Sequence, residues 1–172
     1  PDGRSFEFEL RDGVMFHDGT ALDAAAVKFS LERTRAMNPF AQASFNLINE
    51  IIVVSPRMLR IVLKEPYPAF MSILAQPQSA IVSPAAVARL GDQFATNPVG
   101  TGPFIFRSRQ ADTNIILEAN PQYFRGAPKL DRLVYRIIPN ASTRRLELEN
   151  GGVDIIQQAG QLAAIPAETI QA

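Results

Sequence analysis

The sequence contains no cysteine, no tryptophan and only one histidine among its 172 residues. The absence of cysteine excludes disulfides and thiolate chemistry within the chain. That absence fits an exported bacterial protein and equally fits many cytosolic proteins. Because His17 is the sole histidine, the chain cannot build a metal site from several histidines.

The chain also lacks an excess of either charge and an apolar run that predicts a membrane span. Basic and acidic side chains number 17 each, so no net positive field favours nucleic acid as a partner. The longest uncharged run, from Pro66 to Ala88, is interrupted by prolines and polar residues. Prolines break a helix, so this run does not predict a transmembrane segment.

What is present is ordinary globular composition, with 47% hydrophobic and 20% charged residues. The length suits one domain, or one lobe of something larger. Asp2-Gly3 at the start is a turn dipeptide that normally joins two strands. Phe6, Phe8 and Leu10 then alternate with polar residues, which predicts a strand with one buried face. We therefore expect the chain to start inside a hairpin whose first strand precedes Pro1.

Periodicity and turn residues predict the elements up to residue 91. Asp23 is a suitable N-cap for a helix that runs to about Ala36, whereas residues 40–49 have no clear pattern. Apolar alternation on both sides of Ser55-Pro56-Arg57 predicts a β-hairpin over 51–63. A short helix is predicted over 69–75, and a second follows the N-cap Ser83 and ends at Gly91.

A rigid turn rich in proline and glycine, residues 97–104, introduces the last part of the chain. Strands are predicted over 104–109, 114–119 and 133–138, and a final short strand over 153–156. Asn140 or Ser142 can cap a helix that continues through Asn150. Strands mixed with short helices and hairpins indicate an α/β or mixed α+β fold with a sheet of mixed direction.

No pattern of residues specifies catalysis. His17 and Asp18, with Ser5 or Ser30 as a nucleophile, form a conceivable hydrolase site. Adjacent residues in a β-turn point apart, however, so a structural role for His17 is favoured. Gly100-Thr101-Gly102 lacks the third glycine of a dinucleotide fingerprint and leads into a strand rather than a helix. A rigid turn is the favoured interpretation of that segment.

The aromatic residues do not follow regular stripes, and core packing is the favoured role for each. Phe40 is the exception, because a bulky aromatic in an irregular polar segment suits the wall of a polar-ligand cleft.

Taken together, several stretches resemble the extracellular solute-binding proteins of family 5, the dipeptide, oligopeptide and nickel receptors of ABC importers. The similar stretches keep their order and span nearly the whole chain: Phe8-Glu9-Leu10-Arg11-Asp12-Gly13-Val14, Phe16-His17-Asp18-Gly19-Thr20, Val27-Lys28-Phe29-Ser30, Leu63-Lys64-Glu65-Pro66, Pro98-Val99-Gly100-Thr101-Gly102-Pro103-Phe104, Leu117-Glu118-Ala119-Asn120-Pro121, Ile138-Pro139-Asn140-Ala141-Ser142-Thr143-Arg144 and Gly151-Gly152-Val153-Asp154-Ile155.

The resemblance implies a receptor that closes two lobes on its ligand, has no catalytic activity and needs no cofactor. It implies a type II periplasmic-binding-protein-like fold, of which residues 1–172 are a single incomplete lobe: part of the first lobe with a mixed sheet, plus a β-hairpin subdomain. The second lobe is expected to lie outside the chain. The implied partners are a small polar solute, most simply a short peptide, and an ABC permease. The implied location is periplasmic or extracytoplasmic, with the parent protein free or lipid-anchored.

The resemblance also carries ligand contacts to particular positions. The aromatic that faces the ligand after the first helix corresponds to Phe40, and the polar residue before a proline corresponds to Gln76. Phe45 and Gln78 are further candidates. Because one wall of the cleft is expected to be missing, we expect weak or no binding by this chain alone. Two other hypotheses remain: a self-associating structural module without a ligand, and the hydrolase built around His17.

Overall fold

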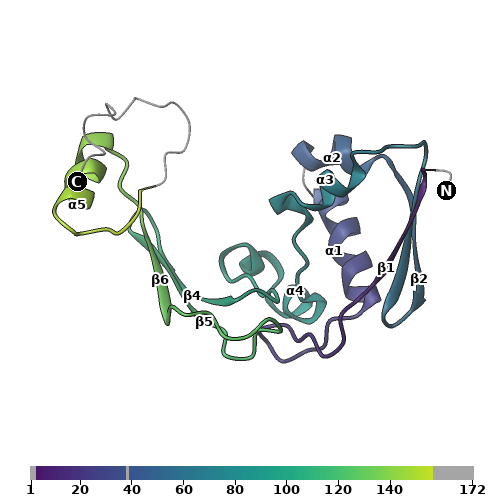
Figure 1. Cartoon of the computed structure of the whole chain (residues 1–172), viewed down its shortest axis with the longest axis horizontal. Helices are drawn as coiled ribbons and strands as arrows, with labels where there is room; N and C mark the ends of the chain where they lie inside the picture. Colours follow the sequence, from purple (N-terminus) through teal and green to yellow (C-terminus); the bar gives the residue numbers. More distant parts are fainter. Residues whose placement is uncertain (1–2, 38, 157–172) are drawn as a thin grey trace.

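The computed structural model describes residues 3–37 and 39–156. Figure 1 shows an elongated, curved molecule. The first sheet and its helices form one end, helix α5 lies at the other end, and the second sheet lies between α5 and the middle of the molecule. The α/β class expected from the sequence is confirmed.

The first sheet contains β1 (Ser5–Glu9), β2 (Ile48–Ser55) and β3 (Met58–Leu63) in the order β1-β3-β2. β2 and β3 form the predicted hairpin, and Phe6 of β1 pairs with Ile61 of β3. Alternate residues of β3 are buried, as the period of two in its sequence predicts.

Helices α1 (Ala24–Met37), α2 (Pro39–Phe45) and α3 (Phe70–Leu74) accompany this sheet. Asp23 caps α1 as predicted, since its Oδ1 accepts a 2.8 Å hydrogen bond from the Ala26 amide. The core joins α1 to the sheet and includes Val27, Leu31, Phe45, Ile48, Ile51, Leu59, Ile61, Leu63 and Phe70. Residues 40–49 gave no clear pattern in the sequence, and the first part of them belongs to helix α2.

A short helical region follows: η1 (Pro77–Ser79), α4 (Pro84–Leu90) and η2 (Gly91–Thr96). Ser83 caps α4 through a bond from the Ala86 amide. Gly91 ends the helix with φ +52°, a conformation that favours glycine. Both predicted helix ends are confirmed.

The second sheet contains β4 (Phe104–Gln110), β5 (Asn114–Ala119) and β6 (Arg132–Arg136), each antiparallel to its neighbour. Helix α5 (Ala141–Glu149) follows, and the Oδ1 of Asn140 caps it through the Thr143 amide. Of the two predicted caps, the structure selects Asn140.

Two predictions about strands are wrong. The sheet of mixed direction is not formed, because every ladder between the described strands is antiparallel. Tight turns join β2 to β3 and β4 to β5, and such turns impose antiparallel pairing. Residues 153–156 form no strand, since no described strand runs beside them to supply ladder hydrogen bonds. The predicted strand over 133–138 is shifted to Arg132–Arg136.

No helix within the described ranges is both long enough and apolar enough to cross a membrane.

Candidate functional site

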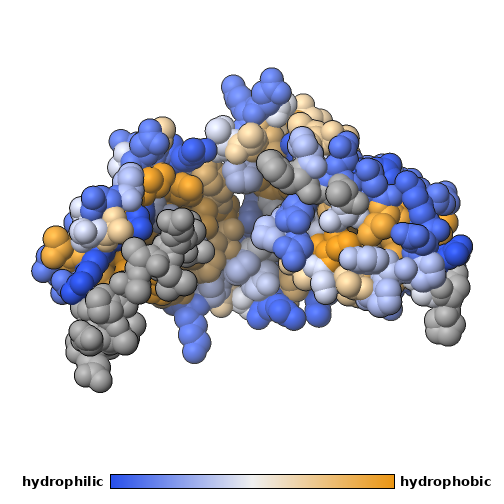
Figure 2. Space-filling view, turned by 90° about the horizontal axis from the view of Figure 1, so that it is seen from above, coloured by the Kyte–Doolittle hydropathy of each residue, from blue (hydrophilic) through white to orange (hydrophobic). Residues whose placement is uncertain are grey.

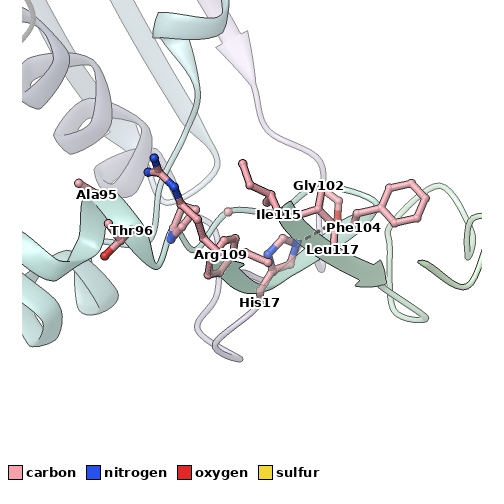
Figure 3. Close-up of a pocket in the computed structure, with 11 residues that line it drawn as sticks. His17, Ala95, Thr96, Gly102, Phe104, Arg109, Ile115 and Leu117 are labelled. Atoms are coloured by element: carbon pink, nitrogen blue, oxygen red, sulfur yellow. Dashed lines mark hydrogen bonds between the residues drawn. The ribbon is translucent and has the colours of Figure 1, made fainter. Parts of the chain in front are cut away.

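The segment from Asn97 to Pro103 joins the helical region to the second sheet, and hydrogen bonds hold this connection from two sides. On one side is the loop that holds His17. The His17 amide donates a 2.9 Å hydrogen bond to the Gly100 carbonyl. Its ring Nε2 lies 3.0 Å from the Gly102 carbonyl oxygen (Figure 3). A carbonyl only accepts, so Nε2 carries the proton in this contact.

On the other side is Asn120, which follows β5 and is 7% exposed. Its side-chain Nδ2 donates to the Gly102 carbonyl at 3.1 Å, and its backbone N–H donates to the Pro103 carbonyl at 2.8 Å. The asparagine therefore fixes the end of the rigid turn to the second sheet. The sequence predicts a rigid turn here, and these contacts agree with a structural role.

Asp18 contacts other residues than its neighbour His17 does. The Ser83 hydroxyl, which is fully buried, donates to Asp18 Oδ2 at 2.5 Å. Thr20 donates to Asp18 Oδ1 through its amide at 3.0 Å and its hydroxyl at 2.6 Å. One carboxylate thus ties the loop of residues 17–20 to the N-terminus of α4.

These contacts set the protonation of Asp18. Partial burial by itself raises the pKa of the carboxyl, but the hydrogen bonds from Ser83 and Thr20 outweigh it. The positive charge of Arg89 acts in the same direction as these bonds. The pKa of Asp18 therefore lies below its ordinary value of 3.8, and the group is a stable carboxylate at neutral pH.

The structure does not form the hydrolase site that His17, Asp18 and a serine could make on the basis of the sequence. Within residues 3–37 and 39–156, His17 and Asp18 bond to different partners and share no hydrogen bond. Ser30 is 2% exposed, and its hydroxyl donates to the Ala26 carbonyl at 2.8 Å and accepts from the Val82 amide at 3.0 Å. These groups have structural roles. Nor does the described part of the chain bring together a group of three or more potential metal ligands.

A cavity of about 380 Å³ lies beside the rigid turn. Four apolar side chains of the second sheet line it: Phe104, Phe106, Ile115 and Leu117. His17, Thr96 and Arg109 add polar atoms to its wall. In Figure 3 the side chain of Arg109 extends across the cavity on the side of Thr96 and Ala95. The strands were evident in the sequence, but the cavity was not, because it forms only where the loop and η2 face the sheet.

The four ligand contacts expected from the resemblance do not line this cavity. Gln76 is exposed and precedes η1, where its carbonyl accepts from the Ser79 amide at 2.9 Å. Gln78 is half-buried, and its carbonyl accepts from the Thr34 hydroxyl at 3.1 Å. Both glutamines therefore belong to the short helical region beside α1.

The two aromatic candidates occupy α2. Phe45 is fully buried and belongs to the core, so its observed role is packing. Phe40 is the second residue of the same helix, but its side chain lies outside what the structure describes. Ligand contact by the four residues is untested and stays a prediction, and the full burial of Phe45 argues against it at that position.

Comparison with known proteins identifies what the chain is similar to. Residues 1–171 match the model of the family described as bacterial extracellular solute-binding proteins, family 5 middle. Glutathione-binding protein GsiB of Salmonella paratyphi A is 38% identical over 155 residues, which cover 87% of this chain and 30% of that protein.

Two solved structures show the same fold. The binding protein MoaA of A. tumefaciens R10, in complex with mannopinic acid, superimposes with a TM-score of 0.82 and 33% identity, covering 90% of this chain and 32% of its own. The periplasmic binding protein DppA of Helicobacter pylori, in complex with the peptide STSA, superimposes with a TM-score of 0.80 and 32% identity. The match covers 89% of this chain and 35% of DppA. The chain thus spans about a third of the length of these relatives.

Proposed function

Since the chain belongs to the bacterial extracellular solute-binding proteins of family 5, we propose that its parent protein captures a small polar solute outside the cytoplasm for an ABC importer. The solute class we propose is a short peptide, including glutathione. The observation that carries the proposal is the family match over residues 1–171, together with the shared fold of DppA in complex with a peptide.

The identity of the relatives supports this solute class. Glutathione is itself a short peptide, and the relative named for binding it is 38% identical to this chain. MoaA binds mannopinic acid on a similar fold, so the fold alone does not select peptides. We accordingly place mannopinic acid in the test as the competing solute class.

We further propose that residues 1–172 form one incomplete lobe, namely part of the first lobe with an extra subdomain. The cleft residues in this proposal are Phe40, Gln76 and Gln78, and the membrane partner is an ABC permease. Phe45 is left out because a fully buried core side chain has no surface to offer a ligand. Catalysis is not part of the proposal, because the polar groups around His17 and Asp18 are engaged in structural bonds.

The test is isothermal titration of the full-length polypeptide that contains this chain with glutathione, the tetrapeptide STSA and mannopinic acid. Saturable binding of glutathione or the tetrapeptide is expected. Binding of mannopinic acid alone would overturn the peptide assignment, and binding of none of the three would overturn the proposal. The 172-residue chain itself should bind the same ligand at least ~100-fold more weakly, because most of the ligand surface stays exposed.

Variants locate the cleft in the same experiment. Phe40→Ala and Gln76→Ala should each weaken the binding of the preferred ligand by about tenfold without lowering the melting temperature. The matched control is Met37→Ala, which removes a side chain that is 66% exposed at the end of α1. Equal affinity in all three variants would remove Phe40 and Gln76 from the site.

A further inference from the structure

The end of helix α5 carries a dipeptide, Asn150-Gly151, that can react with itself. The side-chain amide of an asparagine can be attacked by the backbone nitrogen of the next residue, and a Cβ on that residue restricts the approach. Three of the eight asparagines precede proline, whose nitrogen has no hydrogen to lose. Four precede residues that have a Cβ: Leu47, Glu50, Ile115 and Ala141. Only Asn150 precedes a glycine.

The local structure leaves Asn150 open to this attack. Asn150 and Gly151 are both exposed, and they follow α5 at the end of the molecule opposite to the first sheet. Figure 2 shows hydrophilic side chains at the surface of that end. Within residues 3–37 and 39–156, no hydrogen bond holds the side chain of Asn150. Asn140 is also exposed, but its Oδ1 accepts a 2.9 Å hydrogen bond from the Thr143 amide.

Gly151 supplies the attacking nitrogen. Its φ of +71° lies in the left-handed region that favours glycine. Its N–H donates a 3.1 Å hydrogen bond to the Leu148 carbonyl, and the ψ of Asn150 is 3°. Attack therefore requires this bond to open and ψ to rotate. Both events need only the last turn of α5 to fray, which costs little at a helix end.

We propose that Asn150-Gly151 is a site of spontaneous deamidation that alters the end of α5. The Gly151 nitrogen gives its proton to solvent and forms a bond to Asn150 Cγ. The Cγ–Nδ2 bond breaks, and the amide nitrogen takes a proton from solvent and leaves as ammonia. Water then opens the cyclic imide at either carbonyl. One opening gives aspartate, and the other gives isoaspartate, in which the backbone runs through the side chain; nothing is oxidised or reduced.

The contacts after Gly151 leave no room for the longer backbone of isoaspartate. The Gly152 N–H donates to the Glu147 carbonyl at 2.7 Å, and the Gly152 carbonyl accepts from Arg136 Nη1 at 2.9 Å. A Cβ at Gly152 would collide with the Glu147 carboxylate, so this glycine packs closely against α5. Isoaspartate adds a backbone carbon before Gly151, and Gly152 then cannot keep both bonds.

Aspartate, the other product, leaves the length of the backbone unchanged. It places a negative charge at the C-terminus of α5, where the helix dipole makes such a charge unfavourable. The two products therefore differ in their effect, and only isoaspartate releases Gly152 from Arg136. This inference goes beyond the solute-binding function and does not depend on it.

The test is incubation of the full-length polypeptide that contains this chain at neutral pH, followed by peptide mapping with a mass-spectrometric fragmentation that distinguishes aspartate from isoaspartate. Both products are expected at position 150. They should form about tenfold or more faster than at Asn140, because the rate of an intramolecular step depends on how readily the attack geometry is reached. A rate at position 150 no greater than at Asn140 would overturn the proposal. Aspartate without isoaspartate would also overturn it, because direct hydrolysis of the amide gives aspartate alone.

Two variants separate the reaction from its consequence. Asn150→Gln should suppress the products, since the longer side chain forms its imide far more slowly, and an undiminished rate would overturn the assignment. Asn150→Asp adds the charge without the extra backbone carbon. Amide hydrogen exchange over residues 147–152 should be faster in the isoaspartate form than in Asn150→Asp. Equal exchange in the two forms would contradict the release of Gly152.

Discussion

His17 and Asn120 contact one and the same acceptor, the carbonyl oxygen of Gly102, at 3.0 Å and 3.1 Å. The histidine belongs to the loop after β1, and the asparagine follows β5. The two residues therefore fasten the start of the chain and the second sheet to the rigid turn between them. A carbonyl oxygen has two lone pairs, so both donors can bind at once.

The shared acceptor predicts a stability pattern for substitutions at these positions. His17→Ala and Asn120→Ala should each lower the free energy of unfolding by about 1 kcal/mol, because one donor to Gly102 remains. The double variant should lose at least ~0.5 kcal/mol more than the sum, since the carbonyl then keeps neither side-chain donor. Urea unfolding of the four proteins measures this difference, and strict additivity would show that the contacts are independent.

Asp18 should make the free energy of unfolding depend on pH in the acidic range. Its pKa is lowered in the folded state, so the unfolded state binds more protons as the pH falls. The stabilisation is fully present above the ordinary value of 3.8 and is lost as the pH falls below that value and through the lowered pKa of the folded state. Urea unfolding between about pH 5 and pH 2 should show a smaller decline for Asp18→Asn than for the unsubstituted protein. Parallel curves for the two proteins would contradict the prediction.

Ser83 has two functions in one hydroxyl: it caps α4 and donates to Asp18. Ser83→Ala should cost about 2 kcal/mol of unfolding free energy, because it removes the cap and leaves the carboxylate with one donor fewer. The control is Asn140→Ala, which removes the exposed cap of α5 and should cost about 1 kcal/mol or less. Chemical denaturation compares the two, and equal losses would show that the bond to Asp18 contributes nothing.

Phe70 and Met71 are neighbours in α3 that differ in burial, so substituting each one measures the contribution of burial to stability. Phe70 is fully buried and its ring lies 5.1 Å from that of Phe6, centroid to centroid, whereas Met71 is 52% exposed. Phe70→Ala should cost about 3–5 kcal/mol, and Met71→Ala should stay within about 0.5 kcal/mol. The melting temperature or urea midpoint distinguishes them. A small loss at Phe70 would mean that α3 does not anchor the first sheet.

Local patterns in the sequence were sufficient for most of the secondary structure. The hairpin was predictable from the apolar alternation before and after Ser55. Helix α4 was predictable from its cap Ser83 and from Gly91, which ends it, because both signals are local in the chain. The helix within residues 40–49 was not, because a helix as short as α2 has little stability of its own, and Phe45 packs it into the core. Residues 153–156 have a strand pattern without a strand beside them.

The sequence by itself determined the family, through motifs spread along nearly all of the chain, and the rigid character of the turn before Phe104. Tertiary structure alone decided the contacts around that turn. His17, Asn120 and Gly102 come together, and so do Asp18 and Ser83, because folding brings distant loops to one place. The shared side of Phe106, Leu117 and Leu133 in the second sheet was likewise hidden, since strand register determines which side chains project from the same side of a sheet. Local sequence cannot specify that register across separate strands.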